Sequence, residues 1–272
     1  MPELPEVETT KRGIAPFLEG ATVTRVTVRQ PQLRWPIPSG IQQLKGARVD
    51  AIERRGKYLL LRSEPGTAIL HLGMSGSLRV ASSSDPLRKH DHVDIGYSST
   101  GVVRFHDPRR FGALLWTTQD PYQHKLLVSL GPEPLSDGFD GDYLFAMTRK
   151  RKLAIKNLIM NSAVVVGVGN IYACEALFLS GVRPSTPSHR VSRAQSHLLV
   201  EHIRSVLSQA IEVGGTTLRD FVNAQGDPGY FRQSLFVYGR AGEPCRLCGS
   251  AIKNRVIGQR SSFFCPSCQG SR

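Results

Sequence analysis

The chain has 272 residues, which is enough for two domains with separate hydrophobic cores. It carries 35 Lys and Arg against 22 Asp and Glu, and this formal net charge of +13 indicates a polyanionic partner and salt-sensitive binding. The sequence lacks an apolar run of about 18 residues, an amphipathic anchor and a signal-peptide pattern, so we expect a cytoplasmic, nucleoid-associated protein with no membrane partner.

The first six residues are Met1-Pro2-Glu3-Leu4-Pro5-Glu6, and removal of Met1 would make the Pro2 nitrogen the N-terminus. An unperturbed α-amine has a pKa near ~8, against ~10.4 for lysine, so it is far more often unprotonated at neutral pH. A secondary amine that attacks a sugar aldehyde carbon gives a cationic iminium, which promotes β-elimination. Two carboxylates beside it suit proton transfer. The same residues also fit an ordinary acidic first turn of the helix predicted for Pro5–Leu18.

From Ala21 to about Thr118, short alternating or apolar stretches are separated by Gly, Pro and Ser turns, which predicts an antiparallel β-sandwich. Three stretches break this pattern with glycines and cations. Each fits either a solvated turn or a ligand contact. They are Arg54-Arg55-Gly56-Lys57, His71-Leu72-Gly73-Met74-Ser75-Gly76-Ser77 and Asp107-Pro108-Arg109-Arg110-Phe111-Gly112.

Residues 131–142 are rich in Gly, Pro and Asp and form the best linker candidate. The apolar periodicity after them becomes helical, with a glycine-containing turn before Asn170. Two helices joined in this way resemble a helix-turn-helix, whose helix N-termini bind phosphate, although Asn170 also fits a simple helix cap. The expected helices are Tyr143–Met160 (one or two), Ile171–Ser180 and Ser192–Val213. Thr216–Gly229 predicts a short helix and a flexible loop that can order over a ligand.

Four of the five cysteines form two C-x-x-C pairs, Cys245/Cys248 and Cys265/Cys268, with 16 residues between the pairs. This spacing matches a tetrahedral four-cysteine zinc site. All four thiolates would be ligands, so we expect one structural Zn²⁺ with no open catalytic position. Residues 255–264 between the pairs predict a β-hairpin with Arg260 at its tip.

Together these motifs resemble the bacterial formamidopyrimidine-DNA glycosylases, the Fpg/MutM family, over nearly the full length. The resemblance implies a two-domain α+β fold. An N-terminal antiparallel β-sandwich with an N-terminal helix would span residues 1–131, and residues 132–148 would form a linker. A helix-two-turn-helix domain would span 149–233 and a zinc-finger β-hairpin 234–272. The matching stretches are Pro2–Thr9, Arg55–Leu59, His71–Gly76, Asp107–Gly112, Val166–Tyr172, Gly214–Leu218 and the cysteine module.

The resemblance further implies a monomeric, bifunctional DNA glycosylase and AP lyase of base excision repair. Its substrate would be duplex DNA containing oxidised purines such as 8-oxoguanine and formamidopyrimidines. Pro2 would attack C1′, Glu3 would act on the deoxyribose ring oxygen, and Lys57 would donate a proton. Glu6 matches a supporting acid, and Arg260 is counted with both the catalytic and the DNA-binding residues.

The remaining implied sites contact DNA. The positions that match phosphate contacts are Lys57, His71, Lys156, Asn170 and Arg260. Those that match the filler of the hole left by the everted base are Met74, Arg109 and Phe111. A loop over the lesion is implied for Thr216 through Tyr230, including Thr217 and Leu218. One departure is Asn161, where the family often carries Asp.

Two other functions remain open at this point. An endonuclease VIII-type glycosylase would prefer oxidised pyrimidines, but the Met74, Arg109 and Phe111 trio favours the purine enzyme. A non-catalytic zinc-finger DNA-binding protein would explain the charge and the cysteines. It would give no reason for Pro2 and Glu3 to occur together with Lys57.

Overall fold

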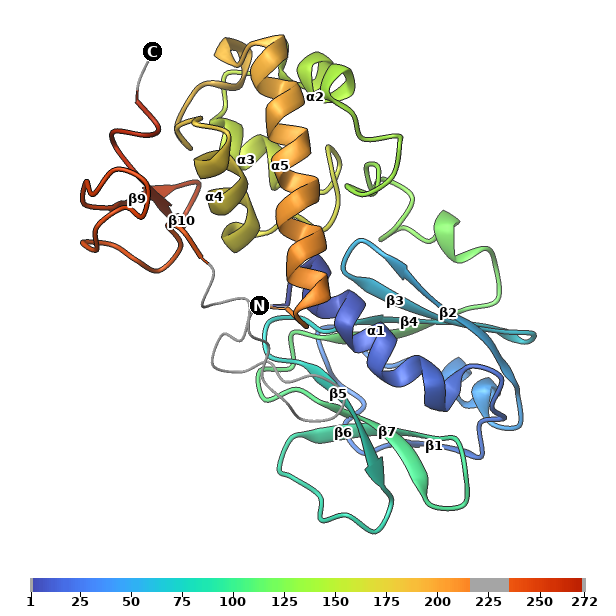
Figure 1. Cartoon of the computed structure of the whole chain (residues 1–272). Coiled ribbons are helices and arrows are strands. Elements are labelled where there is room, and N and C mark those ends of the chain that lie inside the picture. Colours follow the sequence, from blue (N-terminus) through green and yellow to red (C-terminus); the bar gives the residue numbers. More distant parts are fainter. Residues whose placement is uncertain (1, 216–234, 271–272) are drawn as a thin grey trace. The chain divides into compact units, whose positions relative to one another are not determined.

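The computed structural model describes residues 2–215 and 235–270 (Figure 1). The predicted lesion-loop residues Thr216, Thr217, Leu218 and Tyr230 lie outside the described residues. The chain forms two units, Met1–Ser129 with Ile211–Arg232, and Leu130–Ala210 with Gln233–Arg272. We refer to them as the first and the second unit and describe each by itself.

The first unit is an antiparallel β-sandwich, as predicted. One sheet has the strand order β1-β6-β7-β5 and the other β2-β3-β4-β8, and every pairing is antiparallel. Apolar side chains such as Leu59, Leu61, Leu70 and Phe105 form one buried core. The strands are β1 (Arg25–Val28), β2 (Val49–Arg55), β3 (Tyr58–Ser63), β4 (Gly66–His71), β5 (Ser77–Ser82), β6 (Asp91–Gly96), β7 (Gly101–His106) and β8 (Ala113–Thr117). Of two short 3₁₀ helices, η1 (Ser39–Leu44) lies between β1 and β2, and η2 (Pro121–Gln123) follows β8.

Helix α1 (Leu4–Leu18) contacts β2, β3 and β5. Its apolar stripe of Val7, Ile14 and Leu18, the residues that predicted the helix, is buried in the core of the sandwich. Burying this stripe fixes the helix, and with it the position of the chain's first residues.

The second unit contains helices and a C-terminal hairpin. Its elements are α2 (Gly141–Thr148), α3 (Ile155–Ile159), α4 (Asn170–Leu179), η3 (Ser188–Arg190), α5 (Arg193–Glu212), β9 (Lys253–Ile257) and β10 (Arg260–Phe264). The last two residues of α5 belong to the first unit. Helices α3 and α4 contact each other, and α4 contacts β10 (Figure 1). The two-domain α+β fold with a helical region and a cysteine-bearing hairpin is thus confirmed.

The predicted domain bounds stay a prediction, but helix α2 begins at Gly141, inside the stretch 132–148 assigned to a linker. Asp140 caps this helix, since its Oδ1 accepts the Tyr143 N–H at 2.7 Å. The end of the predicted linker is therefore helical. No helix in the described ranges has the length and apolarity needed to cross a membrane.

Candidate functional site

The two N-terminal carboxylates are buried at the start of α1. Glu3 and Glu6 are each 2% exposed, and Pro2 is buried as well. The Glu3 N–H donates to Glu6 Oε2 at 2.8 Å, one half of a reciprocal capping box. Both carboxylates are therefore held rigidly beside Pro2, which differs from a solvated acidic helix start.

Gly215 approaches Glu6 at the far end of the described part of the first unit. Its φ is +85°, and a Cβ added to it would lie 3.1 Å from Glu6 Oε1. A side chain here would be strained by the positive φ and packed tightly against the carboxylate, so glycine suits this position. The Gly214-Gly215 motif thus ends at the Glu6 carboxylate.

Lys57 lies in the two-residue turn between β2 and β3, where Gly56 adopts φ +57°. Arg54 ties this turn to α1: its Nε donates to Glu8 Oε2 at 2.8 Å, and its Nη1 donates to the Gly56 carbonyl at 3.1 Å. Burial raises the pKa of Glu8, but the hydrogen bond from Arg54 and the charges of Lys11 and Arg54 outweigh it and hold this pKa below its usual value. Glu8 is therefore a carboxylate that fixes the Lys57 turn against the helix carrying Glu3.

His71 ends strand β4, and its ring lies 4.8 Å from that of Tyr58. Burial, together with the charges of Lys57 and Arg34, lowers the pKa of His71 to about 4. The Gly73 N–H donates to His71 Nδ1 at 2.9 Å, so Nδ1 is an acceptor and Nε2 carries the hydrogen. At neutral pH His71 offers a ligand one N–H and no charge.

Asp107 joins the two glycine-rich loops of the first unit. It is fully buried; its Oδ1 accepts the Ser75 hydroxyl at 2.7 Å, and its Oδ2 accepts the Gly112 N–H at 2.8 Å. Gly73, at φ +69°, packs so closely that an added Cβ would lie 2.4 Å from Gly112 N. We did not predict this role of Asp107, because the sequence does not reveal which loop carboxylate is buried.

These two loops present the predicted base-replacing trio together. Met74 and Phe111 are 37% and 44% exposed, and the Arg109 guanidinium carbon lies 4.9 Å from the centre of the Phe111 ring. Exposed apolar side chains beside a stacked arginine suit insertion into a base stack. The trio and His71 line a pocket of about 690 Å³, together with Gln32, Leu33, Arg34, Gly73 and Arg110. Neither Pro2 nor Glu3 is among its lining residues.

In the second unit, Lys156 and Asn170 both bind the backbone of the hairpin. Lys156 is fully buried; its Nζ donates to the Ser261 carbonyl at 3.2 Å and to Ser262 Oγ at 2.6 Å. Asn170 Nδ2 donates to the same Ser261 carbonyl at 2.9 Å. Arg260 directly precedes Ser261 and is exposed. The structure thus brings three predicted phosphate-binding residues to one turn, and phosphate contact by all three stays a prediction.

Asn161, the departure from the family pattern, begins the turn after α3. Its Oδ1 accepts the Ala163 N–H at 3.0 Å, and its carbonyl accepts the N–H of Val164 at 2.8 Å. An amide oxygen accepts this hydrogen bond as a carboxylate would, so the turn forms without the charge.

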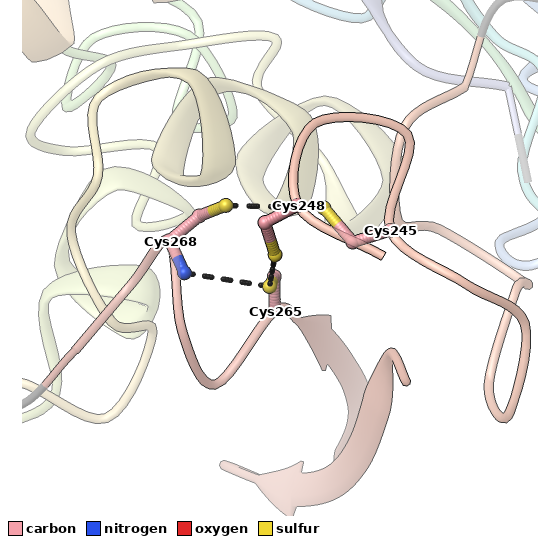
Figure 2. Close-up of side chains that lie close together, drawn as sticks. All are labelled: Cys245, Cys248, Cys265 and Cys268. Atoms are coloured by element: carbon pink, nitrogen blue, oxygen red, sulfur yellow. Dashed lines mark hydrogen bonds between the residues drawn. The ribbon is translucent and has the colours of Figure 1, made fainter. Parts of the chain in front are cut away.

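The four predicted metal ligands converge in the second unit, and Figure 2 shows them around one point. All four sulfur atoms lie within 4.8 Å of one another, with Cys248 Sγ 3.4 Å from Cys265 Sγ and Cys245 Sγ 3.9 Å from Cys268 Sγ. Tetrahedral zinc with Zn–S bonds of about 2.3 Å requires sulfur separations of roughly 3.8 Å. The donor set fits one Zn²⁺ with no fifth position for a substrate.

Three family models match the chain. The formamidopyrimidine-DNA glycosylase N-terminal domain matches residues 1–114, the H2TH domain of the same enzymes matches residues 130–222, and a zinc finger found in FPG and IleRS matches residues 242–270. The zinc-finger match and the converging cysteines together establish one structural zinc.

Known relatives match the whole chain. The formamidopyrimidine-DNA glycosylases of Pseudomonas fluorescens and Pseudomonas aeruginosa are each 57% identical over 270 residues, covering 99% of this chain and all of theirs. The MutM (Fpg) structure from Thermus thermophilus is 37% identical, with a TM-score of 0.89 and full coverage of both chains. A variant Fpg from Lactococcus lactis in complex with Fapy-dG-containing DNA is 32% identical, with a TM-score of 0.92, covering 99% of this chain and all of that one.

Proposed function

Because the chain belongs to the formamidopyrimidine-DNA glycosylase family and is a DNA glycosylase of base excision repair, we propose that it excises oxidised purines and then cleaves the abasic strand. The observation that carries this proposal is the burial of Pro2, Glu3 and Glu6 in one capped turn. A merely DNA-binding protein has no need to bury two carboxylates beside its N-terminal proline. Action as a monomer and a cytoplasmic location are part of the proposal.

The proposed chemistry begins at the Pro2 nitrogen, freed by removal of Met1. Its lone pair forms a bond to C1′, and the bond from C1′ to the base nitrogen breaks, with the bond electrons leaving on the base; the new ammonium then loses its N–H proton to solvent. Glu3 protonates the ring oxygen as the sugar opens, and an iminium forms between Pro2 and C1′. Lys57 gives a proton to the departing base, which carries the electrons of the broken bond. Arg54 and Glu8 tie the turn of Lys57 to α1.

Strand cleavage follows from the iminium, because it acidifies the C2′ hydrogens. Loss of a C2′ proton expels the 3′ phosphate in β-elimination, and a second proton loss expels the 5′ phosphate in δ-elimination. Both phosphates leave as anions, which phosphate-binding side chains such as Arg260 stabilise. The zinc supplies the fold of the hairpin and takes part in no bond-making step.

Recognition of the lesion is assigned to the pocket of the first unit. We propose that Met74 and Phe111 enter the base stack while Arg109 pairs with the base left opposite the lesion. A planar guanidinium can donate two hydrogen bonds to the edge of a cytosine. This accounts for a preference for lesions opposite cytosine, since eversion of the damaged base costs a few kcal/mol that these contacts offset.

The test is to trap the iminium. Protein whose N-terminus has been read by mass spectrometry is incubated with a duplex containing 8-oxoguanine opposite cytosine, in the presence of borohydride. We expect a covalent adduct that maps to Pro2. Absence of an adduct from protein that starts at Pro2 would overturn the proline mechanism.

A second substrate class belongs in the same experiment. A Lactococcus lactis Fpg has been solved with DNA that contains an oxidised pyrimidine, so a thymine-glycol duplex forms the comparison arm. We expect slower trapping on this duplex. Faster trapping there than on 8-oxoguanine would favour the endonuclease VIII-type specificity.

A further inference from the structure

Glu175 is a buried acid that the proposed chemistry does not use. It lies in the middle of α4 and is 2% exposed. Its carboxylate accepts three successive backbone N–H groups: Oε2 from Phe236 at 2.7 Å, and Oε1 from Val237 at 3.0 Å and Tyr238 at 2.8 Å. Burial raises the pKa of Glu175, and these three hydrogen bonds oppose the rise.

Three consecutive N–H groups around one anion require a carboxylate. Both oxygens act as acceptors here, and a glutamine would replace one of them with an NH₂ group that faces an N–H donor. A buried charge is retained only where hydrogen bonds compensate its lost hydration. The arrangement therefore fixes the backbone of residues 236–238 on α4 more firmly than apolar packing alone would.

The held segment lies between α4 and the zinc hairpin. Phe236 stacks on Phe178 of α4, with ring centres 5.4 Å apart, and the Tyr238 ring lies 5.0 Å from that of Phe263 in β10. Val237 packs in one buried cluster with the zinc ligands Cys245 and Cys265. Fixing this segment thus fixes β10, the strand that begins at Arg260.

The N-terminal end of helix α4 also contacts the hairpin. Asn170 at the start of α4 donates to the Ser261 carbonyl, next to Arg260. The hairpin turn itself abuts α3, because a Cβ on Gly258 would lie 2.5 Å from Asn157 Nδ2. The position of Arg260 is therefore set from the turn side by Asn170 and from the strand side through Phe263 and the segment that Glu175 holds.

We propose that Glu175 is a positioning residue for DNA binding, whose carboxylate holds residues 236–238 on α4 so that Arg260 meets the phosphate of the everted nucleotide. This inference rests on the phosphate-binding role proposed above for Arg260. It predicts that loss of the carboxylate weakens DNA binding through Arg260 and leaves base excision by Pro2 and Glu3 intact.

The experiment is a double-mutant cycle between Glu175→Gln and Arg260→Ala in the full-length, zinc-loaded protein. Affinity is measured with a duplex that carries a non-cleavable tetrahydrofuran abasic site opposite cytosine. We expect E175Q to raise Kd by about tenfold, the effect of losing a charge-assisted hydrogen bond. The single-turnover rate of base excision at saturating DNA should change by less than about twofold, because the phosphates that Arg260 stabilises leave only after the base has gone. In the R260A background, E175Q should raise Kd by less than about a further twofold, because the side chain through which Glu175 acts has been removed.

Controls separate positioning from folding. Glu201→Gln removes an exposed carboxylate from α5 and should leave Kd unchanged. Zinc content and the melting temperature are measured for every variant. Glu175→Asp keeps both acceptor oxygens but on a side chain that is shorter by one methylene. We expect it to weaken DNA binding by about threefold and to retain full zinc content.

The outcomes distinguish the two proposals. If R260A alone leaves Kd unchanged, the phosphate role of Arg260 is wrong, and the role of Glu175 falls with it. If R260A weakens binding but E175Q has no effect, or adds its full effect in the R260A background, the Glu175 proposal alone is overturned. Loss of zinc from both E175Q and E175D would also overturn it, since the carboxylate would then be holding the fold of the zinc module.

Discussion

At the scale of single residues, the site depends on buried polar groups held at fixed positions. Glu3, 2% exposed, is the central one in the proposed chemistry, since it delivers a proton to the opening sugar ring. Its amide counterpart has a similar shape and can still accept the helix N–H that a capping box supplies. Replacing it therefore tests the proton transfer more than the fold.

We expect Glu3→Gln to bind lesion DNA with near-normal affinity and to excise 8-oxoguanine about 10²- to 10⁴-fold more slowly, the usual contribution of a general acid or base. Single-turnover excision and Kd measured on the same duplex check this. Glu64→Gln, at an exposed position of the first unit, is the matched control. Full excision by Glu3→Gln would remove Glu3 from the mechanism.

His71 makes a prediction about pH and stability. Its folded-state pKa of about 4 lies below the ordinary value of 6.5, so the folded state favours the neutral ring. The stability that this provides is fully present above pH 6.5, and it is lost as the pH falls towards 4 because the unfolded chain takes up the proton first. Between pH 7 and pH 5, the free energy of unfolding should fall by about 2 kcal/mol more in the wild type than in His71→Gln.

Urea unfolding of both proteins at the two pH values measures this difference. Comparing the pH-dependent change within each protein removes the stability effect of the substitution itself. An equal fall in both proteins would mean that the fold does not lower the pKa of His71.

At the scale of elements, the two loops joined by Asp107 pack against each other and together carry Met74, Arg109 and Phe111. Substitution of Gly73 tests whether the arrangement of the two loops depends on the close approach of their backbones, and substitution of Gly46 is the matched control. Both have positive φ, +69° and +85°, but an added Cβ meets Gly112 N at 2.4 Å in one case and nothing within 4 Å in the other.

Gly46→Ala should cost about 1–2 kcal/mol, the strain of a left-handed residue. Gly73→Ala should cost at least about 1 kcal/mol more, because the opposing backbone cannot move aside without displacing the loop. It should also weaken the preference for cytosine opposite the lesion, as Arg109 shifts with the loop. Thermal unfolding and excision from duplexes with each opposite base are the measurements, and equal costs would remove the close approach as a constraint.

The sequence predicted the elements whose pattern is local and missed those set by tertiary contacts. The apolar spacing of α1 predicted a helix, and the short alternating or apolar stretches from Ala21 to about Thr118 predicted a β-sandwich. The bounds of strand β2 could not be read in the same way, because its register shifts between Val49 and Ala51, which breaks the alternation of buried side chains. Among site residues, motifs revealed Pro2 and the cysteines. The roles of Asp107 and Glu175 depend on partners far along the chain, which no local pattern records.

The zinc hairpin is the other element with a testable role. Chelation should remove the metal and disorder the hairpin, so that the Ser261 carbonyl no longer accepts hydrogen bonds from Lys156 and Asn170. We expect Cys248→Ser to weaken DNA binding by at least about tenfold, since a structural site that loses one thiolate binds zinc poorly. Zinc content and Kd are measured together, with Glu201→Gln, at an exposed position of α5, as the control. Normal binding without zinc would contradict the role of the hairpin.

At the scale of the whole molecule, the charge of +13 makes DNA affinity depend on salt concentration. The charged residues that contact phosphate determine how steeply Kd changes with salt. Each cation that neutralises a phosphate contributes about 0.9 to the slope of log Kd against log salt concentration. Lys57 and Arg260 are cationic, whereas His71 is neutral at pH 7 and contributes nothing to the slope.

Arg260→Ala should therefore lower the slope by about 0.9, while His71→Gln should weaken binding about equally at all salt concentrations. Titrations between about 50 and 200 mM salt measure both slopes. A lower slope in His71→Gln would show that the ring binds phosphate as a cation, and would contradict the neutral tautomer assigned from its hydrogen bond with Gly73.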